Sequence, residues 1–410
     1  MKKILGLSVI GLVGAASLLG ACSNETGGEE QTTLEVWAMG EEGNNLPKLL
    51  EGFTEDNPDI NIDVQAIPWD QSHEKLLTAV ASGNGPDVLQ LGTTRVPEFA
   101  DAGILLPLDE YMDEYPEFAP ENFFDGAVES TQFDGETIGI PWYVETRALY
   151  YRTDLLAEAG FDQAPQNWDE LKSAASSLSE EDDVYGFSID MNDPIVPVIL
   201  GWQNGADFVD ENGNVDVRDE AFVEGLEFYV SFFEEGISST SGQMDTIEGF
   251  RNGVLPMFQS GPWMINLINE QAPEIEGDWD IAMLPGQDTN ASVMGGSNLS
   301  IFHNSENVDE SLRLISYLSQ EETQLEWFDI VSALPSNVEA WEHESLSDNP
   351  FLETFGQQLT EAKASPQIQK WDSLSGELLR SLERIIVGGA DFDEEISSFQ
   401  DKVSDIMEEE

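Results

Sequence analysis

The chain has 410 residues, 81 of them acidic and 16 basic, and its formal net charge is -65 at pH 7. This charge argues against nucleic acids and anionic ligands as partners, because both would be repelled. The hydrophobic share of 40% and the aromatic share of 10% are those of a globular protein, so the acidity belongs to a folded surface. We expect that surface to be adapted to high external salt, since the Debye length falls to about 3 Å at 1 M.

The first 21 residues predict an exported protein. Two lysines precede an apolar run over residues 4–19, and Gly20-Ala21 closes it, which is the layout of a secretory signal. Residues 19–22 resemble a bacterial lipobox, and this resemblance implies cleavage before Cys22 and lipid attachment to its sulfur. A plain secretory signal with an unused cysteine is the alternative. Because Cys22 is the only cysteine, no internal disulfide can form.

Residues 22–31 run from this cysteine through a stretch rich in Gly, Glu, Ser, Thr and Asn, which predicts a flexible tether. No later stretch is apolar for long enough to span a bilayer. We therefore expect the protein to be anchored by lipid to the outer face of the cytoplasmic membrane without crossing it. The chain after the leader is long enough for two domains.

Alternating strands and helices follow the tether. Apolar alternation predicts strands at 33–39, 60–66 and 87–91, and helical spacing predicts helices that end before Asn57 and at Gly83. This order is typical of βαβ units with a parallel sheet. Ligands bind beyond the carboxyl ends of such strands. Here those ends are polar or aromatic: Gly40-Glu41-Glu42, Pro68-Trp69-Asp70 and Gly92-Thr93-Thr94-Arg95.

Residues 141–152 combine aromatic rings, a carboxylate and a guanidinium in an extended run. Alternation places Tyr143, Glu145 and Arg147 on one face. An aromatic, an acceptor and a donor on one face suit a polyhydroxylated ligand. We interpret this stretch as a crossing between two lobes where a ligand is held. A half-buried strand with a solvated polar face is the alternative.

A second set of helices and strands after residue 145 predicts a second lobe. Helices are expected at 153–159, after the capping residue Asn167, and at 222–233, 310–318 and 377–386. Strand-like segments are expected at 184–189, 281–285 and 293–302. Residues 210–216 imitate a calcium loop, but its glycine and closing glutamate are absent from the required positions. A hairpin turning at Asn212-Gly213 is favoured.

Eight short motifs occur in order along the chain: VWAMG at 36–40, GPDV at 85–88, AGILLPL at 102–108, LYYRTDLL at 149–156, GFRNG at 249–253, SGPW at 260–263, GGSNL at 295–299 and LPS at 334–336. With this set the chain resembles the extracellular solute-binding proteins of ABC importers. The resemblance is to the large family that takes up oligosaccharides and includes the maltose-binding type. It covers nearly the whole mature chain.

The resemblance implies an α/β, two-lobed periplasmic-binding-protein fold of type II. Each lobe would be a mostly parallel sheet flanked by helices, and three crossings near 144–147, 284–285 and 333–337 would form a hinge. Lobe one would comprise residues 32–144 and 283–337, and lobe two residues 145–282 and 338–410. A monomer without cofactor or metal would capture a sugar and deliver it to a membrane permease. Arg95 stands where many similar sequences carry an aromatic, so the substrate of relatives does not transfer.

A sugar ring has apolar faces and a rim of hydroxyls, so its site needs flat aromatics with polar groups at the edge. The candidates for stacking lie beside small or polar residues: Trp69, Trp202, Trp263 and Trp371. Trp168 and Trp327 lie in helical patterns and are expected in the core. The candidates for hydrogen bonds are Glu41, Asp70, Thr93, Tyr143, Glu145, Asn204, Asp207, Gly296, Ser297 and Asn298. Core packing, surface charge and turn chemistry are the alternatives for these positions.

The sequence lacks the motifs of common enzymes. Its three histidines form no H-E-x-x-H pair, and there is no G-x-S-x-G elbow, P-loop or C-x-x-C. His73 falls within a predicted helix and is expected to be a solvated or capping group. A secreted glycosidase with two carboxylates is the alternative from another class. A peptide or amino-acid binder of the same architecture would need a cationic clamp, which the few basic residues do not favour.

Overall fold

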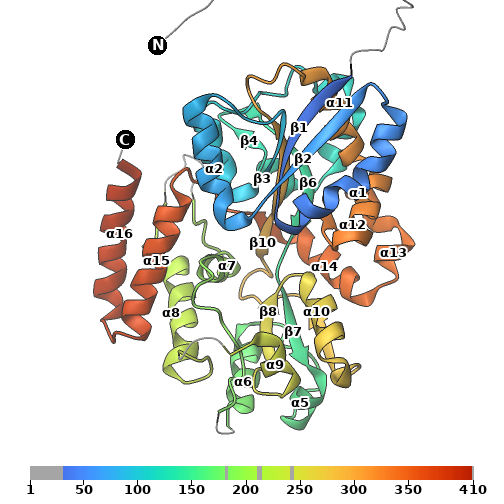
Figure 1. Ribbon diagram of the computed structural model, residues 1–410. Helices are drawn as coiled ribbons and strands as arrows, with labels where there is room; N and C mark the ends of the chain where they lie inside the picture. The colour runs from blue at the N-terminus through green and yellow to red at the C-terminus, as the bar shows by residue number, and fades with distance from the viewer. Residues whose placement is uncertain (1–30, 181–182, 210–214, 241–243, 409–410) are drawn as a thin grey trace, which may run out of the picture.

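The computed structural model describes residues 31–180, 183–209, 215–240 and 244–408, which form two lobes, one above the other in Figure 1. The predicted leader, Cys22 and most of the tether lie outside these ranges, as do most of the calcium-like loop and its Asn212-Gly213 turn. An antiparallel bridge between Val209 and Val215 flanks that turn. Among the described residues, no helix combines the length and apolar character that a membrane crossing needs.

The larger lobe, at the top of Figure 1, is built on a seven-stranded sheet with the order β11-β6-β10-β3-β1-β2, in which β12 also pairs with β10. β1 pairs in parallel with β2 and β3, whereas β10 runs antiparallel to β3 and β6. The strands are β1 (Thr32–Met39), β2 (Ile60–Ile67), β3 (Val88–Gly92), β6 (Ile140–Glu145), β10 (Ser292–Ile301), β11 (Leu334–Pro335) and β12 (Ala362–Ala364).

The smaller lobe contains a three-stranded sheet of order β8-β7-β9, formed by β7 (Ala148–Arg152), β8 (Met257–Ser260) and β9 (Trp279–Ala282). Both pairs are antiparallel, so the expected mostly parallel sheet is wrong for this lobe. Four of the five residues of β7 are buried and only Arg152 is charged, so the sequence of this strand is similar to that of a strand in a parallel sheet, which is covered on both faces. A hairpin of β4 (Gln132–Phe133) and β5 (Glu136–Thr137) completes the strands.

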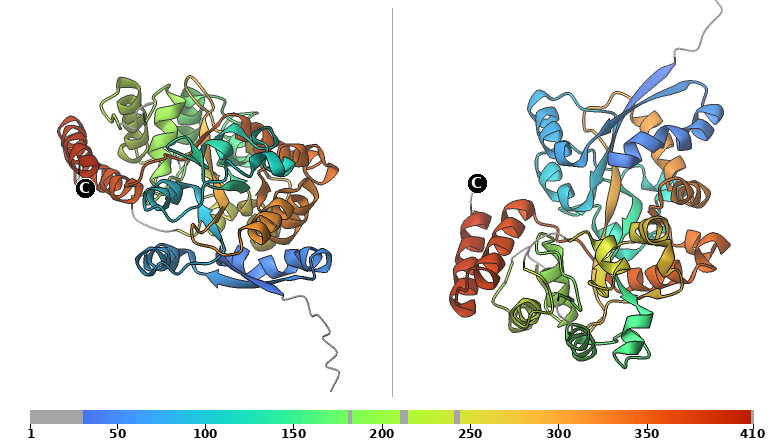
Figure 2. Two further views of the ribbon diagram at one scale, coloured as in Figure 1. Left: turned by 90° about the horizontal axis from the view of Figure 1, so that it is seen from above. Right: turned by 60° about the horizontal axis from the view of Figure 1, so that its bottom comes forward.

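Helices cover both sheets. The α-helices are α1 (Gly40–Asp56), α2 (Trp69–Ser82), α3 (Val96–Asp101), α4 (Asp125–Glu129), α5 (Thr153–Glu158), α6 (Trp168–Leu178), α7 (Ile195–Gln203), α8 (Glu220–Glu234), α9 (Thr246–Arg251), α10 (Trp263–Gln271), α11 (Val308–Ser319), α12 (Glu321–Val331), α13 (Glu344–Ser347), α14 (Pro350–Thr360), α15 (Trp371–Ile386) and α16 (Phe392–Glu408). The 3-10 helices are η1 (Thr93–Arg95), η2 (Met112–Glu114), η3 (Pro116–Phe118), η4 (Pro120–Asn122), η5 (Pro273–Ile275) and η6 (Glu339–Glu342). α15 and α16 pack together at one side of the molecule, next to α8 (Figure 2).

Local sequence explains most of these boundaries. α1 buries the apolar face of Leu46, Leu49, Leu50 and Phe53 and ends at Asp56. α2 ends where Gly83 adopts the left-handed conformation that glycine tolerates. α6 begins as predicted at Asn167, whose Oδ1 accepts a hydrogen bond from the Glu170 amide at 2.9 Å.

One expectation fails in the smaller lobe, and one helix was not predicted. Residues 184–189 form no strand, and only Ser188 makes a single bridge, to Phe258. The sequence also gives no periodic signal for α7, because all nine of its residues are buried and a helix that is apolar all round shows no polar face.

The core of each lobe is anchored by aromatic residues. Trp327 is 1% exposed and stacks on Trp142 with ring centroids 5.1 Å apart, beneath the large sheet. Trp168 is 7% exposed and stacks on Phe228 at 4.2 Å in the smaller lobe. The predicted core positions of Trp168 and Trp327 are confirmed.

The chain passes from the large sheet to the small one through Thr146 and Arg147. β6 ends at Glu145 and β7 begins at Ala148, so two residues separate strands of different sheets. Thr146 is fully buried, and its hydroxyl donates to Ser292 Oγ at 3.0 Å. Ser292 also accepts from the backbone N–H of Arg147 at 3.2 Å and donates to its carbonyl at 3.0 Å. These bonds fix the backbone where the lobes meet.

Candidate ligand-binding cavity

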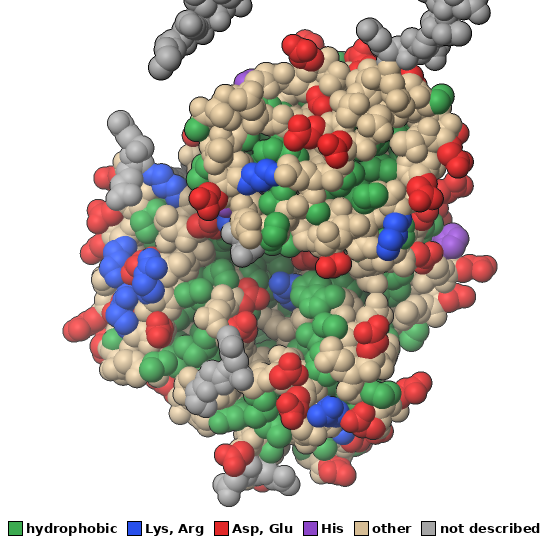
Figure 3. Space-filling view, in the orientation of Figure 1, with side chains coloured by type: hydrophobic (Ala, Val, Ile, Leu, Met, Phe, Trp, Pro, Cys, Tyr) green, Lys and Arg blue, Asp and Glu red, His purple; other side chains and the backbone are tan. Residues whose placement is uncertain are grey.

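A cavity of about 450 Å³ lies between the lobes, at the hollow near the centre of Figure 3. Three of its lining residues follow neighbouring strands: Glu42 comes after β1, Trp69 after β2, and Thr93 after β3. Because β1, β2 and β3 run parallel, their carboxyl ends meet at one edge of the sheet. The structure thus brings together the polar strand ends that the sequence predicts as a cleft wall.

Trp69 forms an open aromatic platform on this wall. Its side chain lies against two glycines: a Cβ on Gly40 would be 2.7 Å from Cδ1 of the indole, and one on Gly92 would be 3.5 Å from Cζ3. Trp69 nevertheless stays 44% exposed, which is unusual for so large an apolar side chain. The two glycines leave room for the indole of Trp69, and the exposed part of that indole can stack on a flat ligand.

Trp371 lines the cavity from the smaller lobe, at the first turn of α15. Its ring packs edge-to-face on Phe208, with centroids 6.1 Å apart and planes at 90°. Only 7% of Trp371 is exposed, so its position is held by the core of that lobe. Trp69 and Trp371 therefore offer aromatic surface from both lobes.

The buried hydroxyl of Tyr143 connects the cavity to the large sheet. It donates to Glu42 Oε1 at 3.1 Å and accepts from Gln90 Nε2 at 3.2 Å and from Ser297 Oγ at 3.1 Å. Burial, followed by the charges of Glu145 and Glu42, raises the pKa of Tyr143 well above its usual value. The phenol therefore stays protonated and remains a donor at neutral pH.

Charged side chains gather where the lobes meet. Glu145 ends β6, Arg147 belongs to the crossing, and Asp193 lines the cavity just before α7. Burial raises the pKa of the Glu145 and Asp193 carboxyls, and the charge of Arg147 partly opposes both shifts. Asp193 Oδ1 also accepts the Ile195 amide at 3.1 Å. The site therefore contains the partly buried carboxyl acceptors of Glu145 and Asp193 beside the guanidinium of Arg147.

Gly296 gives the cavity an exposed piece of backbone. Its φ of +119° lies in a region that favours glycine, and a Cβ there would be 2.1 Å from the Tyr143 carbonyl oxygen. β10 pairs with β6 at this point and shifts register between Ser297 and Asn298. A glycine is therefore needed for β10 to lie so close to the crossing strand.

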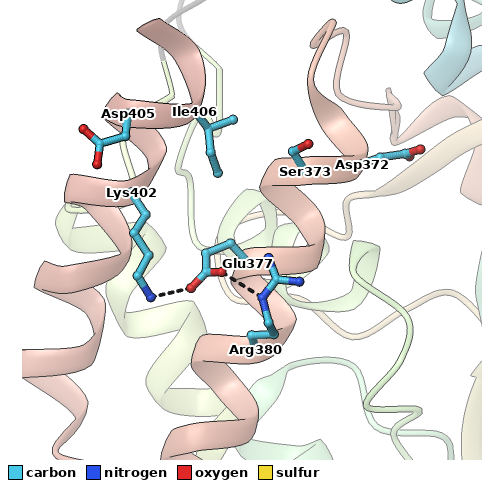
Figure 4. Close-up of a pocket in the computed structure, with 7 residues that line it drawn as sticks. All are labelled: Asp372, Ser373, Glu377, Arg380, Lys402, Asp405 and Ile406. Carbon is cyan, nitrogen blue, oxygen red and sulfur yellow. Dashed lines mark hydrogen bonds and ion pairs between the residues drawn. The ribbon is translucent and has the colours of Figure 1, made fainter. Parts of the chain in front are cut away.

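A second hollow, also of about 450 Å³, lies on the surface between α15 and α16 (Figure 4). Three of its charged groups are already paired with one another, because Glu377 accepts hydrogen bonds from Lys402 and from Arg380. This hollow contains no aromatic residue. We therefore assign the ligand site to the cavity between the lobes.

Comparisons with known proteins identify the family of the chain. The family of bacterial extracellular solute-binding proteins matches residues 38–325. The chain belongs to this family. Among solved structures, the sugar-binding protein MalE of Xanthomonas citri has 34% identity and a TM-score of 0.87, covering 92% of this chain and 97% of that one. The two-lobed type II fold of this solute-binding protein is thereby established.

Two further relatives carry ligands in their names. The GacH receptor of Streptomyces glaucescens, solved unliganded and with acarbose, has 26% identity and a TM-score of 0.79, covering 92% of this solute-binding protein and 99% of that chain. An arabinooligosaccharide-binding protein of Halalkalibacterium halodurans is 24% identical, over 81% of this chain and 78% of its own length. These relatives bind sugars or sugar-like compounds and none is named as an enzyme.

Six residues predicted from the sequence line the cavity of the solute-binding protein: Trp69, Thr93, Tyr143, Glu145, Gly296 and Trp371. Ser297 and Asn298 lie behind it instead. Ser297 holds the Tyr143 hydroxyl, while the Asn298 side chain bonds to Ser130. Ser297 and Asn298 are fully buried, so only Gly295 and Gly296 of the glycine-rich motif face the cavity.

The other predicted residues lie elsewhere. Glu41 is exposed on α1, and its neighbour Glu42 lines the cavity in its place. Trp202 is 6% exposed within the core formed around α7, so packing explains it. The Asn204 amide donates to the Ala221 carbonyl and to Glu224 Oε2. The Asp207 side chain is 78% exposed and pairs with Lys363 at 3.0 Å.

Trp263, at the start of α10, contacts the cavity only through Arg147, whose guanidinium lies 4.8 Å from its ring centroid. The side chain of Asp70 lies outside what the structure describes. His73 is not a free surface group, because its Nε2 contacts the Glu98 carboxylate at 2.8 Å. No group of three potential metal ligands occurs in the described ranges.

The sequence reasoning missed Asp193 and Gln90. Asp193 stands just before Pro194 and α7, a position where an Asp often accepts a backbone amide, and this signal could have marked a helix start beside the cleft. Gln90 is fully buried in β3, and its amide also bonds to the Met39 N–H at 2.7 Å. A polar residue inside an apolar strand was the available signal for a buried hydrogen-bond network.

Proposed function

We propose that this protein is the substrate-binding lipoprotein of an ABC importer, and that it captures an oligosaccharide in the cavity between its lobes. One observation carries the proposal: two tryptophans, Trp69 and Trp371, enter one cavity from opposite lobes, and hydrogen-bonding groups line the space near them. This arrangement matches the apolar faces and polar rim of sugar rings. The cavity volume of about 450 Å³ lies within the range of about 300–1,000 Å³ that is common for small-molecule sites.

Capture would proceed by closure of the lobes about the crossing at Thr146 and Arg147. To change the ratio of closed to open protein from 1:99 to 99:1, the ligand must prefer the closed form by about 5.5 kcal/mol. Hydrogen bonds to charged groups contribute about 1.5–3 kcal/mol each. Two stacked rings and a few such bonds are therefore enough, and the closed form would then engage the permease.

Lipid attachment at Cys22 would hold the protein, as a monomer, at the outer face of the cytoplasmic membrane. The lipobox-like residues 19–22 support this part of the proposal. In cells, a Cys22→Ala variant should be released into the medium, because a single signal sequence without lipid provides no lasting anchor. Equal membrane retention of the variant would contradict lipid anchoring.

A panel of oligosaccharides tests the binding function. The purified protein in high-salt buffer is heated with maltotriose, arabinotriose, lactose or diacetylchitobiose, and unfolding is followed by fluorescence. A true ligand at 100 times its Kd stabilises the folded state by about 2.7 kcal/mol, which raises the Tm by a few degrees. Chromogenic glycosides should show no turnover. Turnover would favour a glycosidase, and a Tm unchanged by every sugar would contradict the proposal.

Trp69→Ala tests the platform directly. We expect the affinity for the best sugar of the panel to fall at least about tenfold, because a stacking surface is lost. The unfolding free energy should stay within about 0.5 kcal/mol, since Trp69 is 44% exposed. Leu77→Ala is the matched control, because Leu77 is a 43% exposed apolar residue on the same helix and does not line the cavity. Equal affinities for both variants would rule out stacking on Trp69.

A further inference from the structure

Arg147 is a cation that lines the cavity, and its side chain has no hydrogen-bond or ion-pair partner among the described residues. The guanidinium lies over the Trp263 ring, 4.8 Å from its centroid, as in a cation–π contact. Its backbone is held on both sides by Ser292, as described above. Within the described residues, no hydrogen bond or ion pair reaches the guanidinium N–H groups. Five donors are therefore available to a ligand.

The surroundings of Arg147 are acidic. Among the described residues that line the cavity, Arg147 is the one cation, while Glu42, Glu145 and Asp193 are carboxyl groups. Arg147 acts electrostatically on both Glu145 and Asp193. No described residue donates a hydrogen bond to the Glu145 carboxylate. The Arg147 donors and the Glu145 acceptor thus line the same cavity without protein hydrogen-bond partners among the described residues. The acidic groups around Arg147 already balance its positive charge.

This combination decides between two ligand chemistries. A guanidinium fork can hold either a carboxylate or two neighbouring hydroxyl oxygens. A ligand carboxylate would meet three acidic side chains in a protein of net charge -65, so the repulsion outweighs one cation. A neutral diol fits both partners, because each hydroxyl can accept from Arg147 and donate to a carboxylate.

We infer that Arg147, stacked on Trp263, is the specificity-determining residue of the cavity: it binds adjacent hydroxyls of an uncharged sugar, while Glu42, Glu145 and Asp193 exclude uronic and other anionic sugars. This inference rests on the proposed function, since it names the class of sugar that the same cavity accepts.

The first test compares ligands on the unchanged protein. The best neutral oligosaccharide of the panel is converted to its aldonate by oxidation and to its alditol by reduction. Both products have an opened terminal ring. They differ in one group: the aldonate carries a carboxylate where the alditol carries a hydroxymethyl group. By titration calorimetry we expect the aldonate to bind at least about tenfold more weakly than the alditol. Equal or tighter binding of the aldonate would overturn the exclusion of anions.

The second test changes the fork. Arg147→Gln should weaken binding of the neutral sugar about 10- to 100-fold, because charge-assisted hydrogen bonds are lost. Arg147→Lys keeps the charge but not the planar fork, and it should recover only part of the affinity. Circular dichroism checks that both variants fold. Full affinity in either variant would overturn the role of the fork while leaving sugar binding intact, whereas binding of no sugar by the unchanged protein would contradict the proposed function itself.

Discussion

Gly296 is the residue at which backbone geometry constrains the site most tightly. Its φ is +119°, and a Cβ would approach the Tyr143 carbonyl oxygen to 2.1 Å. We expect Gly296→Ala to lower the unfolding free energy by about 1–3 kcal/mol, because the residue must leave its conformation or push the strands apart. Denaturant titration of the unliganded protein measures this.

Gly295→Ala provides the matched control for that variant. The nearest atoms to a Cβ on Gly295 are 4.0 Å away, on Glu145 and Ser365, so an alanine fits. Its unfolding free energy should be unchanged or slightly higher, because alanine reduces the freedom of the unfolded chain. If both alanine variants lost the same stability, close packing of β10 on β6 would not be the cause.

Prediction of site residues from the sequence worked where strand order alone determines position. Trp69, Thr93 and Glu145 follow or end strands of the large sheet, so their place at the cleft follows from topology. For Trp202, strand order could not decide between a place in the cavity and a place in the core. Trp202 lies in an apolar helix that gives no orientation, and its neighbours Gly201 and Gln203 are as buried as the tryptophan.

At the scale of elements, an ion pair connects the two lobes beside the cavity. Arg95 of η1 contacts Asp372 of α15, and the neighbouring Thr93 hydroxyl donates to Ser365 Oγ at 3.4 Å. The side chains of Arg95 and Asp372 are 29% and 55% exposed, so the pair is screened by solvent. Arg95 is thus a group that pairs across the cleft.

We expect a double-mutant cycle of Arg95→Ala and Asp372→Ala to give a coupling of about 0.2–1 kcal/mol at low salt, because exposed pairs contribute little. The coupling should vanish in 1 M NaCl.

Small-angle scattering of the unliganded single variants should show a larger radius of gyration, since one contact that holds the lobes together is gone. Glu98→Gln is the control, because Glu98 lies 3.8 Å from Arg95 but does not bridge the cleft. Unchanged scattering of the Arg95 variant would exclude a role in lobe closure.

α15 and α16 are joined by a buried carboxylate, Glu377, shown in Figure 4. Its burial by itself would raise the pKa, but hydrogen bonds from Lys402, Arg380 and Arg384 outweigh burial and lower the pKa to about 2. The Glu377 side chain is 11% exposed, but those of Arg380, Arg384 and Lys402 are 39–59% exposed, so solvent screens these bonds in part. A carboxyl whose pKa falls on folding stabilises the fold at pH values above its unfolded pKa.

The stabilisation by Glu377 should therefore be complete above about pH 5 and lost as the pH falls from about 4.5 toward 2. We expect Glu377→Gln to cost about 1–2 kcal/mol of unfolding free energy at pH 7, because solvent screens its exposed cationic partners, and the difference from the unchanged protein to shrink through that acid range. Denaturant titrations at several pH values measure this. Glu383→Gln, an exposed change on the same helix, should track the unchanged protein. A pH-independent difference for Glu377→Gln would show that its charge is not the cause.

Elements with amphipathic periodicity were predictable, and pairing between strands was not. The run β1-α1-β2-α2-β3 appears close to its predicted bounds because apolar alternation, helical spacing and the Gly83 stop are all local signals. The antiparallel order of β8-β7-β9 depends on contacts between segments more than 100 residues apart, such as Ala148 with Ser260. Local composition carries no information about such pairing.

At the scale of the whole molecule, the acidic residues are spread over the surface. Figure 3 shows red side chains across both lobes on the visible face and few blue ones. Several basic side chains already take part in ion pairs, among them Arg218 with Asp401 and Arg313 with Asp59. These pairs cannot neutralise 81 acidic residues with 16 basic ones, so unpaired carboxylates repel one another throughout the folded state.

Salt should therefore stabilise this protein. Between 0.01 M and 1 M NaCl the Debye length falls from about 30 Å to about 3 Å, which removes repulsion between distant carboxylates. We expect the Tm to rise by at least about 5 °C over this range and then to level off. Screening saturates in this way, whereas salting-out by sulfate continues to grow with concentration. Repeating the series at pH 4, where many exposed carboxylates are protonated, should reduce the rise, because less charge remains to be screened. A Tm independent of salt at pH 7 would mean that the acidic surface is tolerated for another reason, such as solubility.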